Sequence, residues 1–134
     1  MPEPRLGAGA AIVRDGRILL FRRLRDPDAG TFSIPGGKVD FLEPVEDALR
    51  REVLEETGLT LGALTLLCVT DQIDPAVPEH WVAPIYLVTD FTGAAEIREP
   101  EKHADLGWYP LDDLPAPLSM AVRAAWPFLR ALEG

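Results

Sequence analysis

The chain has 134 residues, 47% of them apolar, which suits one domain that buries its own hydrophobic core. Its net charge of −9 argues against a nucleic-acid groove or an anionic membrane surface as the main partner. The sequence has no uncharged apolar run long enough to span a bilayer, and its N-terminus lacks a signal-peptide pattern. A single cysteine, Cys68, fits a reducing cytoplasm, and its apolar surroundings predict a core position.

The first part of the chain predicts a hairpin followed by a loop. Two apolar runs in AAIVRDGRILLFRR meet at Asp15-Gly16, a pair that favours a two-residue turn between strands. Residues 27–30 read as a loop. FSIPGG reads as a short extended piece, because a residue before proline disfavours helix.

A helix is predicted next. Apolar residues recur at helical spacing and form one stripe, which consists of Val45, Ala48, Leu49 and Val53. Pro44 suits the first turn of this helix, and Gly58 suits its C-terminal cap.

The second half of the chain predicts more strands and a final helix. LTLLCVTDQ and HWVAPIYLVTDF are rich in β-branched and aromatic residues, and Pro75 and Pro78 bracket the loop between them. EPEKHADLGWYPLDDLPA reads as a loop with a short extended piece at 107–109, and 118–132 as a helix that Pro127 breaks or bends. This order predicts an α/β fold in which helices cover a mixed sheet, with the strand order left open.

An acidic cluster stands out within residues 36–59, GGKVDFLEPVEDALRREVLEETGL. Glu52, Glu55 and Glu56 share one helix face, and their carboxylates form a hard-oxygen patch suited to Mg²⁺ or Mn²⁺. The Gly36-Gly37 pair lets the backbone turn sharply and approach a ligand closely, and its carbonyls add potential metal ligands. The alternative is a solvated acidic face, which is what most runs of charge are.

The segment resembles the Nudix box, in which glycines, glutamates and one arginine recur at fixed spacing. The matching positions are Gly37, Glu43, Arg51, Glu52, Val53, Glu55, Glu56, Gly58 and Leu59. At average residue usage, roughly one chain in ten million of this size matches by chance. We therefore interpret residues 1–134 as a single Nudix hydrolase domain with its box at 37–59.

The resemblance implies an α/β/α sandwich with the box helix and a C-terminal helix on the faces of a mixed sheet. It implies hydrolysis of a nucleoside diphosphate linked to a group X, with Mg²⁺ or Mn²⁺ as cofactor. The implied metal ligands are the Gly36 carbonyl, Glu52, Glu55 and Glu56. Glu52 or Glu55 would lie near the attacking water, and Arg51 would orient the glutamates through an ion pair with Glu43 or Glu55.

Many Nudix proteins take one more acid from a later loop. The candidate here is Glu101, as metal ligand and catalytic residue, with Glu99 next; a plain surface loop is the alternative. For Lys102 and His103 an exposed loop position is favoured, with contact to phosphate or base as the alternative. The substrate-binding candidates are Arg22, Arg23, Gly37, Lys38, His80 and Trp81. Of the two arginines only one should face inward, because strand side chains alternate.

The region 80–115 resembles small Nudix proteins that act on nucleoside triphosphates. It favours a (d)NTP as the small-molecule substrate, giving (d)NMP and pyrophosphate, with ADP-ribose or a nucleotide sugar as the alternative. A non-catalytic nucleotide-binding module is disfavoured because every box position is filled. The sequence leaves a homodimer open.

Overall fold

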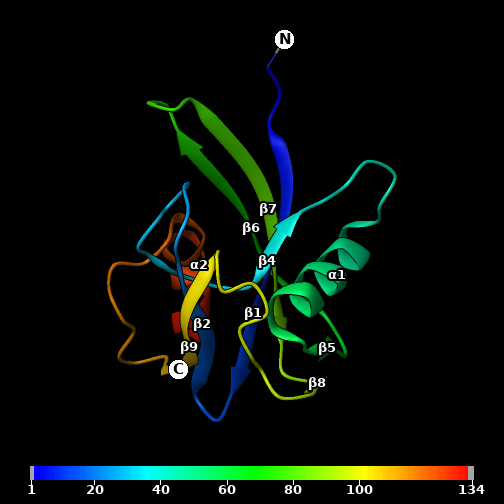
Figure 1. Cartoon of the computed structure of the whole chain (residues 1–134), viewed down its shortest axis with the longest axis vertical. Helices are drawn as coiled ribbons and strands as arrows, with labels where there is room; N and C mark the ends of the chain where they lie inside the picture. The colour runs from blue at the N-terminus through cyan, green and yellow to red at the C-terminus, as the bar shows by residue number, and fades with distance from the viewer. Residues whose placement is uncertain (1, 133–134) are drawn as a thin grey trace.

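The computed structural model describes residues 2–132 and contains a mixed sheet with two helices (Figure 1). The elements in chain order are β1 (Arg5–Arg14), β2 (Arg17–Arg23), β3 (Phe32–Ser33), β4 (Gly36–Lys38), α1 (Val45–Thr57), β5 (Thr60–Leu61), β6 (Thr65–Asp74), β7 (Glu79–Val88), β8 (Phe91–Thr92), β9 (His103–Pro110) and α2 (Met120–Ala131).

The main sheet has the strand order β3-β2-β1-β7-β6, and β4 and β9 pair with β1 and β2 outside this path. β1 and β7 are parallel, whereas the other paired strands of this sheet are antiparallel. The predicted hairpin is confirmed: β1 turns into β2 at Asp15 and Gly16, whose φ angles are 53° and 73°. Two successive positive φ angles match the twist of the strands that such a turn connects.

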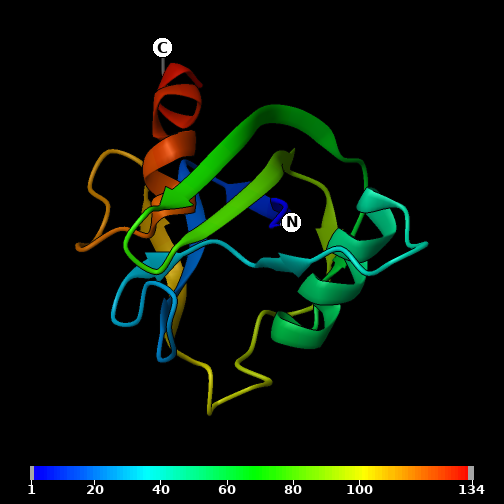
Figure 2. The ribbon, with the colours of Figure 1, turned by 90° about the horizontal axis from the view of Figure 1, so that it is seen from above.

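The two helices cover opposite faces of the sheet, and Figure 2 shows the strands between them. β1 contributes to both cores because its side chains alternate. Ala8, Ala10 and Ile12 belong to the cluster that contains Leu49 and Val53 of α1. Ala11 belongs to the other cluster, with Val122, Ala125 and Leu129 of α2 and the buried Cys68. The predicted α/β architecture and the core position of Cys68 are therefore confirmed.

The predicted box helix is also confirmed, with its ends where the sequence places them. α1 starts directly after Pro44. At its other end Gly58 has a φ of 79° and donates its backbone N–H to the carbonyl of Leu54. Glycine adopts this left-handed conformation without steric cost, which is why the helix ends there.

Three details differ from the sequence-based expectations. The extended piece at 107–109 is part of β9, which runs from His103 to Pro110 because it pairs along β2 from Arg23 to Arg17. The short strands β5 and β8 were not expected; they pair only with each other. α2 continues through Pro127 to Ala131, so the proline does not end the helix.

Within residues 2–132, no helix combines the length and the apolar character that crossing a membrane would require.

Candidate active site

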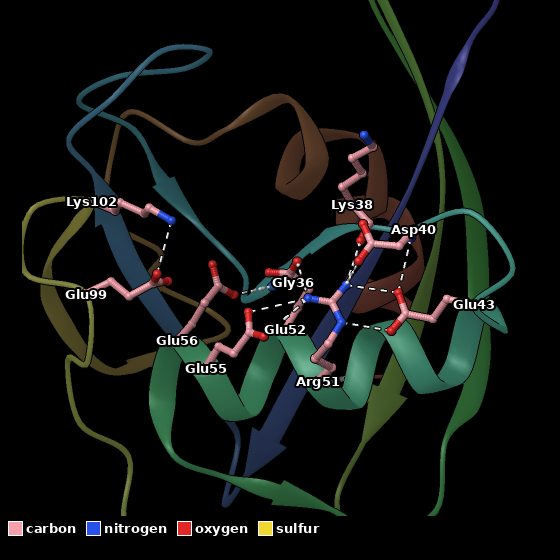
Figure 3. A network of polar contacts seen from close by, with 10 residues as sticks. All are labelled: Gly36, Lys38, Asp40, Glu43, Arg51, Glu52, Glu55, Glu56, Glu99 and Lys102. Atoms are coloured by element: carbon pink, nitrogen blue, oxygen red, sulfur yellow. Dashed lines mark hydrogen bonds and ion pairs between the residues drawn. The ribbon is translucent and has the colours of Figure 1, made fainter.

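Helix α1 presents a row of carboxylates toward the strand β4 (Figure 3). Glu52, Glu55 and Glu56 lie on one side of the helix because their spacing of three and four residues brings them to the same face. Glu56 is buried, Glu52 is half-buried and Glu55 is exposed. The row therefore leads from the protein interior to solvent.

Arg51 connects the start of the box with this row (Figure 3). Its guanidinium donates two hydrogen bonds to Glu43, Nε to Oε2 at 2.8 Å and Nη2 to Oε1 at 2.9 Å. Nη1 donates to Glu52 at 3.0 Å and lies 3.4 Å from Glu55, while Nη2 donates to the Lys38 carbonyl at 3.2 Å. Arg51 thus holds the loop before α1, the strand β4 and two carboxylates in one arrangement.

These contacts shift the pKa values of the partners in opposite directions. The hydrogen bond from Arg51 lowers the pKa of Glu43, and the bond to Glu43 raises the pKa of Arg51. The pKa of Glu52 is raised, because the cost of burial exceeds the effect of the neighbouring guanidinium. Glu43 is therefore a fixed anchor, whereas Glu52 would gain from additional positive charge.

Glu56 is held from two elements that are distant in the chain. The backbone N–H of Gly36 donates to its Oε1 at 2.8 Å, and Nε2 of His103, on β9, lies 3.4 Å from its Oε2. His103 is buried and stacks on Phe21, with the ring centroids 3.9 Å apart. Burial raises the pKa of Glu56 to about 8 and lowers that of His103 to about 4, so near pH 7 both groups are neutral and their contact is not an ion pair.

Glu99 lies next to this pair. One ligand atom each from Glu56, Glu99 and His103 falls within 4.8 Å of the others. Lys102 donates to Glu99 at 3.0 Å, and this contact raises the pKa of Lys102. Glu101, the acid that the sequence favoured, is exposed and lies outside this group, so the structure brings Glu99 to the carboxylates in its place.

The carboxylate row fits a divalent cation. Its donors are hard oxygens, which Mg²⁺ and Mn²⁺ prefer. Burial disfavours the ionised form of Glu56 so strongly that the pKa reaches about 8, and a bound cation would remove that cost. His103 Nδ1 is buried and has no hydrogen-bond partner among the described residues, so this side of the site is polar but incompletely satisfied.

A cavity of about 240 Å³ lies on the α2 side of the sheet, directly beside β4. Gly36, Gly37 and Lys38 line the end that borders the carboxylates, and Gly37 is in contact with Glu52. Arg23 also lines the cavity. Two basic residues, Arg23 and Lys38, thus line an open cavity that borders the acidic row.

The remaining substrate-binding candidates divide between the cavity and the surface. Trp81 lines the cavity, but His80 lies outside it and is 3.1 Å from Asp71, since neighbouring strand residues face opposite sides. Arg22 pairs with Asp105 at 2.7 Å outside the cavity, so Arg23 is the inward member of the arginine pair, as expected for only one of them.

His103 was expected to be an exposed loop residue. In the structure it is a buried residue of β9 beside Glu56, so the sequence analysis missed its place in the site. β9 places two residues, Asp105 and Leu106, opposite the single residue Phe21 of β2, and Asp105 has a φ of 53°. This bulge reverses the side-chain alternation within β9. Counting back from Trp108 would therefore assign His103 to the wrong face even with the strand known.

The chain belongs to the NUDIX domain family, whose model matches residues 3–132. It is similar to a MutT NUDIX hydrolase from Burkholderia pseudomallei, with 58% identity and a TM-score of 0.92, covering 94% of this chain and 98% of that one. It is also similar to the E. coli ORF135 protein, with 29% identity and a TM-score of 0.78, covering 98% and 89%.

Among curated relatives, the chain is 32% identical over 113 residues to the ADP-ribose pyrophosphatase of Methanocaldococcus jannaschii, covering 84% of this chain and 66% of that protein. It is 33% identical over 106 residues to the human 8-oxo-dGDP phosphatase NUDT18, covering 75% and 30%. The chain thus spans less than two thirds of the length of these relatives.

Proposed function

We propose that this protein is a divalent-metal-dependent Nudix pyrophosphohydrolase, which cleaves a nucleoside diphosphate linked to X. The observation that supports the proposal is the row of Glu52, Glu55 and Glu56, held by Arg51 beside a cavity with inward basic groups. A solvated acidic face would require neither the Arg51 contacts nor the two-sided hold on Glu56.

Each residue has a role that follows from its position. Arg23 and Lys38 bind the phosphate chain at the edge of the cavity. Arg51 fixes Glu52 and Glu55, one of which accepts the proton of the attacking water. The water oxygen bonds to one phosphorus as the bond from that phosphorus to the bridging oxygen breaks.

Glu52, Glu55, Glu56 and the Gly36 carbonyl are the proposed ligands of Mg²⁺ or Mn²⁺, and we assign to Glu99 the role expected of Glu101. When bound, the cation supplies positive charge that balances the developing phosphate charge and lowers the pKa of water.

The substrate we propose is a (d)NTP, which gives the (d)NMP and pyrophosphate. The cavity of about 240 Å³ is near the lower end for a small-molecule site, and it suits one nucleoside better than a linked pair. ADP-ribose remains a second candidate, because the relative from Methanocaldococcus jannaschii carries the name ADP-ribose pyrophosphatase.

The test is turnover with Mg²⁺ and Mn²⁺ against the eight common NTPs and dNTPs, ADP-ribose and several nucleotide sugars. We expect pyrophosphate and a monophosphate from at least one triphosphate. Glu55→Gln should reduce turnover by about 100-fold or more while the melting temperature stays the same. The matched control is Glu46→Gln, an exposed acid on the same helix, which should retain turnover.

Two outcomes would contradict this proposal in different ways. Cleavage of ADP-ribose to AMP and ribose phosphate, with triphosphates untouched, would keep the reaction class and replace the substrate. A Glu55→Gln variant as active as the parent would remove the assigned mechanism.

We also propose action in the cytoplasm, which the single buried thiol of Cys68 supports, and assembly as a homodimer. β6 exposes more than half of the surface of Leu66, Val69 and Ile73, and Leu6 of β1 is 52% exposed. Exposed apolar side chains on neighbouring strands can mark a protein–protein interface. Sedimentation should show a dimer that Val69→Asp dissociates; a monomeric parent protein would refute it.

A further inference from the structure

The far part of the cavity has the form of a site for a planar ring. Gly7 and Gly9 of β1 line it, and the side chains of Ile34 and Ile85 lie against Gly9. The Trp81 indole stands beside Gly7, because a Cβ on Gly7 would lie 3.4 Å from the ring. A pocket lined by apolar side chains and one aromatic ring favours a planar, largely apolar ligand.

Asp28 provides a fixed acceptor in this cavity. Its backbone has a φ of 63°, and its carbonyl accepts the Thr31 hydroxyl at 2.6 Å. Its Oδ2 accepts the backbone N–H of Met120, the first residue of α2, at 3.0 Å. Oδ1 has no hydrogen bond within residues 2–132, so the carboxylate is oriented but keeps one oxygen for a ligand.

Gln72 provides a second acceptor, and its amide orientation follows from its neighbour. The Thr70 hydroxyl donates its proton to the carbonyl of Ala83 at 2.9 Å. That oxygen therefore acts as acceptor toward Gln72, whose Nε2 donates to it at 3.1 Å. The amide oxygen of Gln72 consequently points away from Thr70, and Gln72 is one of the residues that line the cavity.

The two acceptors are the carboxylate of Asp28 and the amide oxygen of Gln72. They favour a ring whose edge toward them carries hydrogen-bond donors. An exocyclic amine donates to such oxygens, whereas a carbonyl in the same place repels them. The Ser33 hydroxyl and the second N–H of the Gln72 amide can donate hydrogen bonds to the ring acceptors that lie beside such an amine.

The geometry points to a base-selective pocket: Asp28 and Gln72 recognise nucleobases that carry an exocyclic amine and reject their oxo counterparts. This inference rests on the proposed function, because it places the nucleoside of the substrate in this cavity and its phosphates toward Arg23 and Lys38. Neither residue belongs to the box, so their contribution is substrate choice and not hydrolysis.

The experiment compares pairs of nucleotides that differ at this edge, CTP with UTP and ATP with ITP. For at least one pair we expect a kcat/KM at least about 10-fold higher for the amino base, the usual discrimination by a paired base edge. Asp28→Asn preserves shape but mixes donor and acceptor, so it should reduce that ratio to within about threefold. Asp26→Asn, the same change at an exposed position of the same loop, should leave the ratio unaltered.

Calorimetric titration of the metal-free protein with CMP, UMP, AMP and IMP separates this inference from the proposed reaction. Tighter binding of the amino bases, abolished by Asp28→Asn, supports the pocket even if no triphosphate is hydrolysed. Hydrolysis with equal kcat/KM within every pair, or a ratio unchanged in Asp28→Asn, overturns the pocket and leaves the reaction intact. Absence of binding by all four monophosphates also overturns it.

Discussion

Arg51 shows how much of the site depends on the geometry of one side chain. Its planar guanidinium reaches both oxygens of Glu43 and, in the other direction, Glu52. Lysine carries the same charge but has one nitrogen, so it cannot reproduce a two-pronged contact. The sequence predicted a pair with Glu43 or Glu55; the contact with Glu52 appears only in the structure.

We expect Arg51→Lys to reduce kcat by about 10- to 100-fold, because groups that orient metal ligands have effects of this size. Among the described residues, the adjacent Arg50 donates a side-chain hydrogen bond only to the carbonyl of Leu61, so Arg50→Lys is the matched control and should retain kcat. Steady-state kinetics of both variants tests this. Equal kcat values for Arg51→Lys and the parent protein would show that the two hydrogen bonds from the guanidinium to Glu43 are not needed for turnover.

We infer that His103 is a positioning residue, because its Nε2 lies 3.4 Å from Oε2 of Glu56 and it is not among the residues that line the cavity. We expect His103→Leu to weaken Mn²⁺ binding by about 10-fold or more, since Glu56 loses the ring nitrogen that lies 3.4 Å from its Oε2. His103→Gln keeps an N–H donor and should bind Mn²⁺ within about threefold of the parent protein.

Calorimetric titration with Mn²⁺ distinguishes these roles. A purely structural histidine would give two variants with equal loss of stability and equal Mn²⁺ affinity. Parent-like affinity in His103→Leu would therefore contradict the positioning role.

At the scale of elements, the short strand β4 positions the site because its first two residues, Gly36 and Gly37, have no side chains. Gly36 has a φ of 153°, and a Cβ there would meet the backbone carbonyl of Ala8. A Cβ on Gly37 would instead meet the carboxylate of Glu52. The close approach of β1 requires the first glycine, and the close approach of Glu52 on α1 requires the second.

Gly37→Ala should therefore reduce turnover by about 10-fold or more with little change in melting temperature, because Glu52 must move and the backbone need not. For the control Gly16→Ala we expect the opposite result, a lower melting temperature with unchanged turnover. Its φ is 73° and it has open space around it, so it should cost about 1 kcal/mol of stability and leave turnover unchanged. Steady-state kinetics and thermal melting of both variants test this difference. The same change in turnover and in melting temperature for both variants would contradict it.

The strand β9 shows where element prediction from sequence fails. A short extended piece was predicted at 107–109, whereas β9 has eight residues and a bulge opposite Phe21. Charged residues and the bulge hide the two-residue alternation, and pairing with β2 maintains the strand. The box helix α1 was predicted correctly because its stripe and caps are local features.

For the whole molecule, a bound cation should increase stability. The folded chain crowds Glu52, Glu55, Glu56 and Glu99, and the unfolded chain separates them. Mg²⁺ or Mn²⁺ at about 100 times its dissociation constant should add about 2.7 kcal/mol to the free energy of unfolding. This corresponds to a rise in melting temperature of about 10 °C for a chain of this size.

Thermal melting with the chloride salts, and with NaCl at matched ionic strength, tests the prediction. Glu56→Gln should reduce the shift caused by the divalent salts. An equal rise in NaCl would show that general screening, and not a bound cation, relieves the repulsion.

From the sequence alone we predicted the fold class, the hairpin turn and the box helix with its ends. The sequence also showed which glutamates form the carboxylate row. Each of these depends on residues only a few positions apart, so periodicity and turn chemistry suffice to predict them. The spacing of Glu52, Glu55 and Glu56 alone puts them on one helix face.

Only the tertiary structure decided which distant residues meet that row. It brought Glu99 and His103 to Glu56, left Glu101 outside this group and His80 outside the cavity, and placed Asp28, on a loop, in the lining of the same cavity as Gln72. These contacts depend on strand order, on the bulge in β9 and on the packing of α2. No local pattern encodes such features, because they arise when segments far apart in the chain bury a common surface.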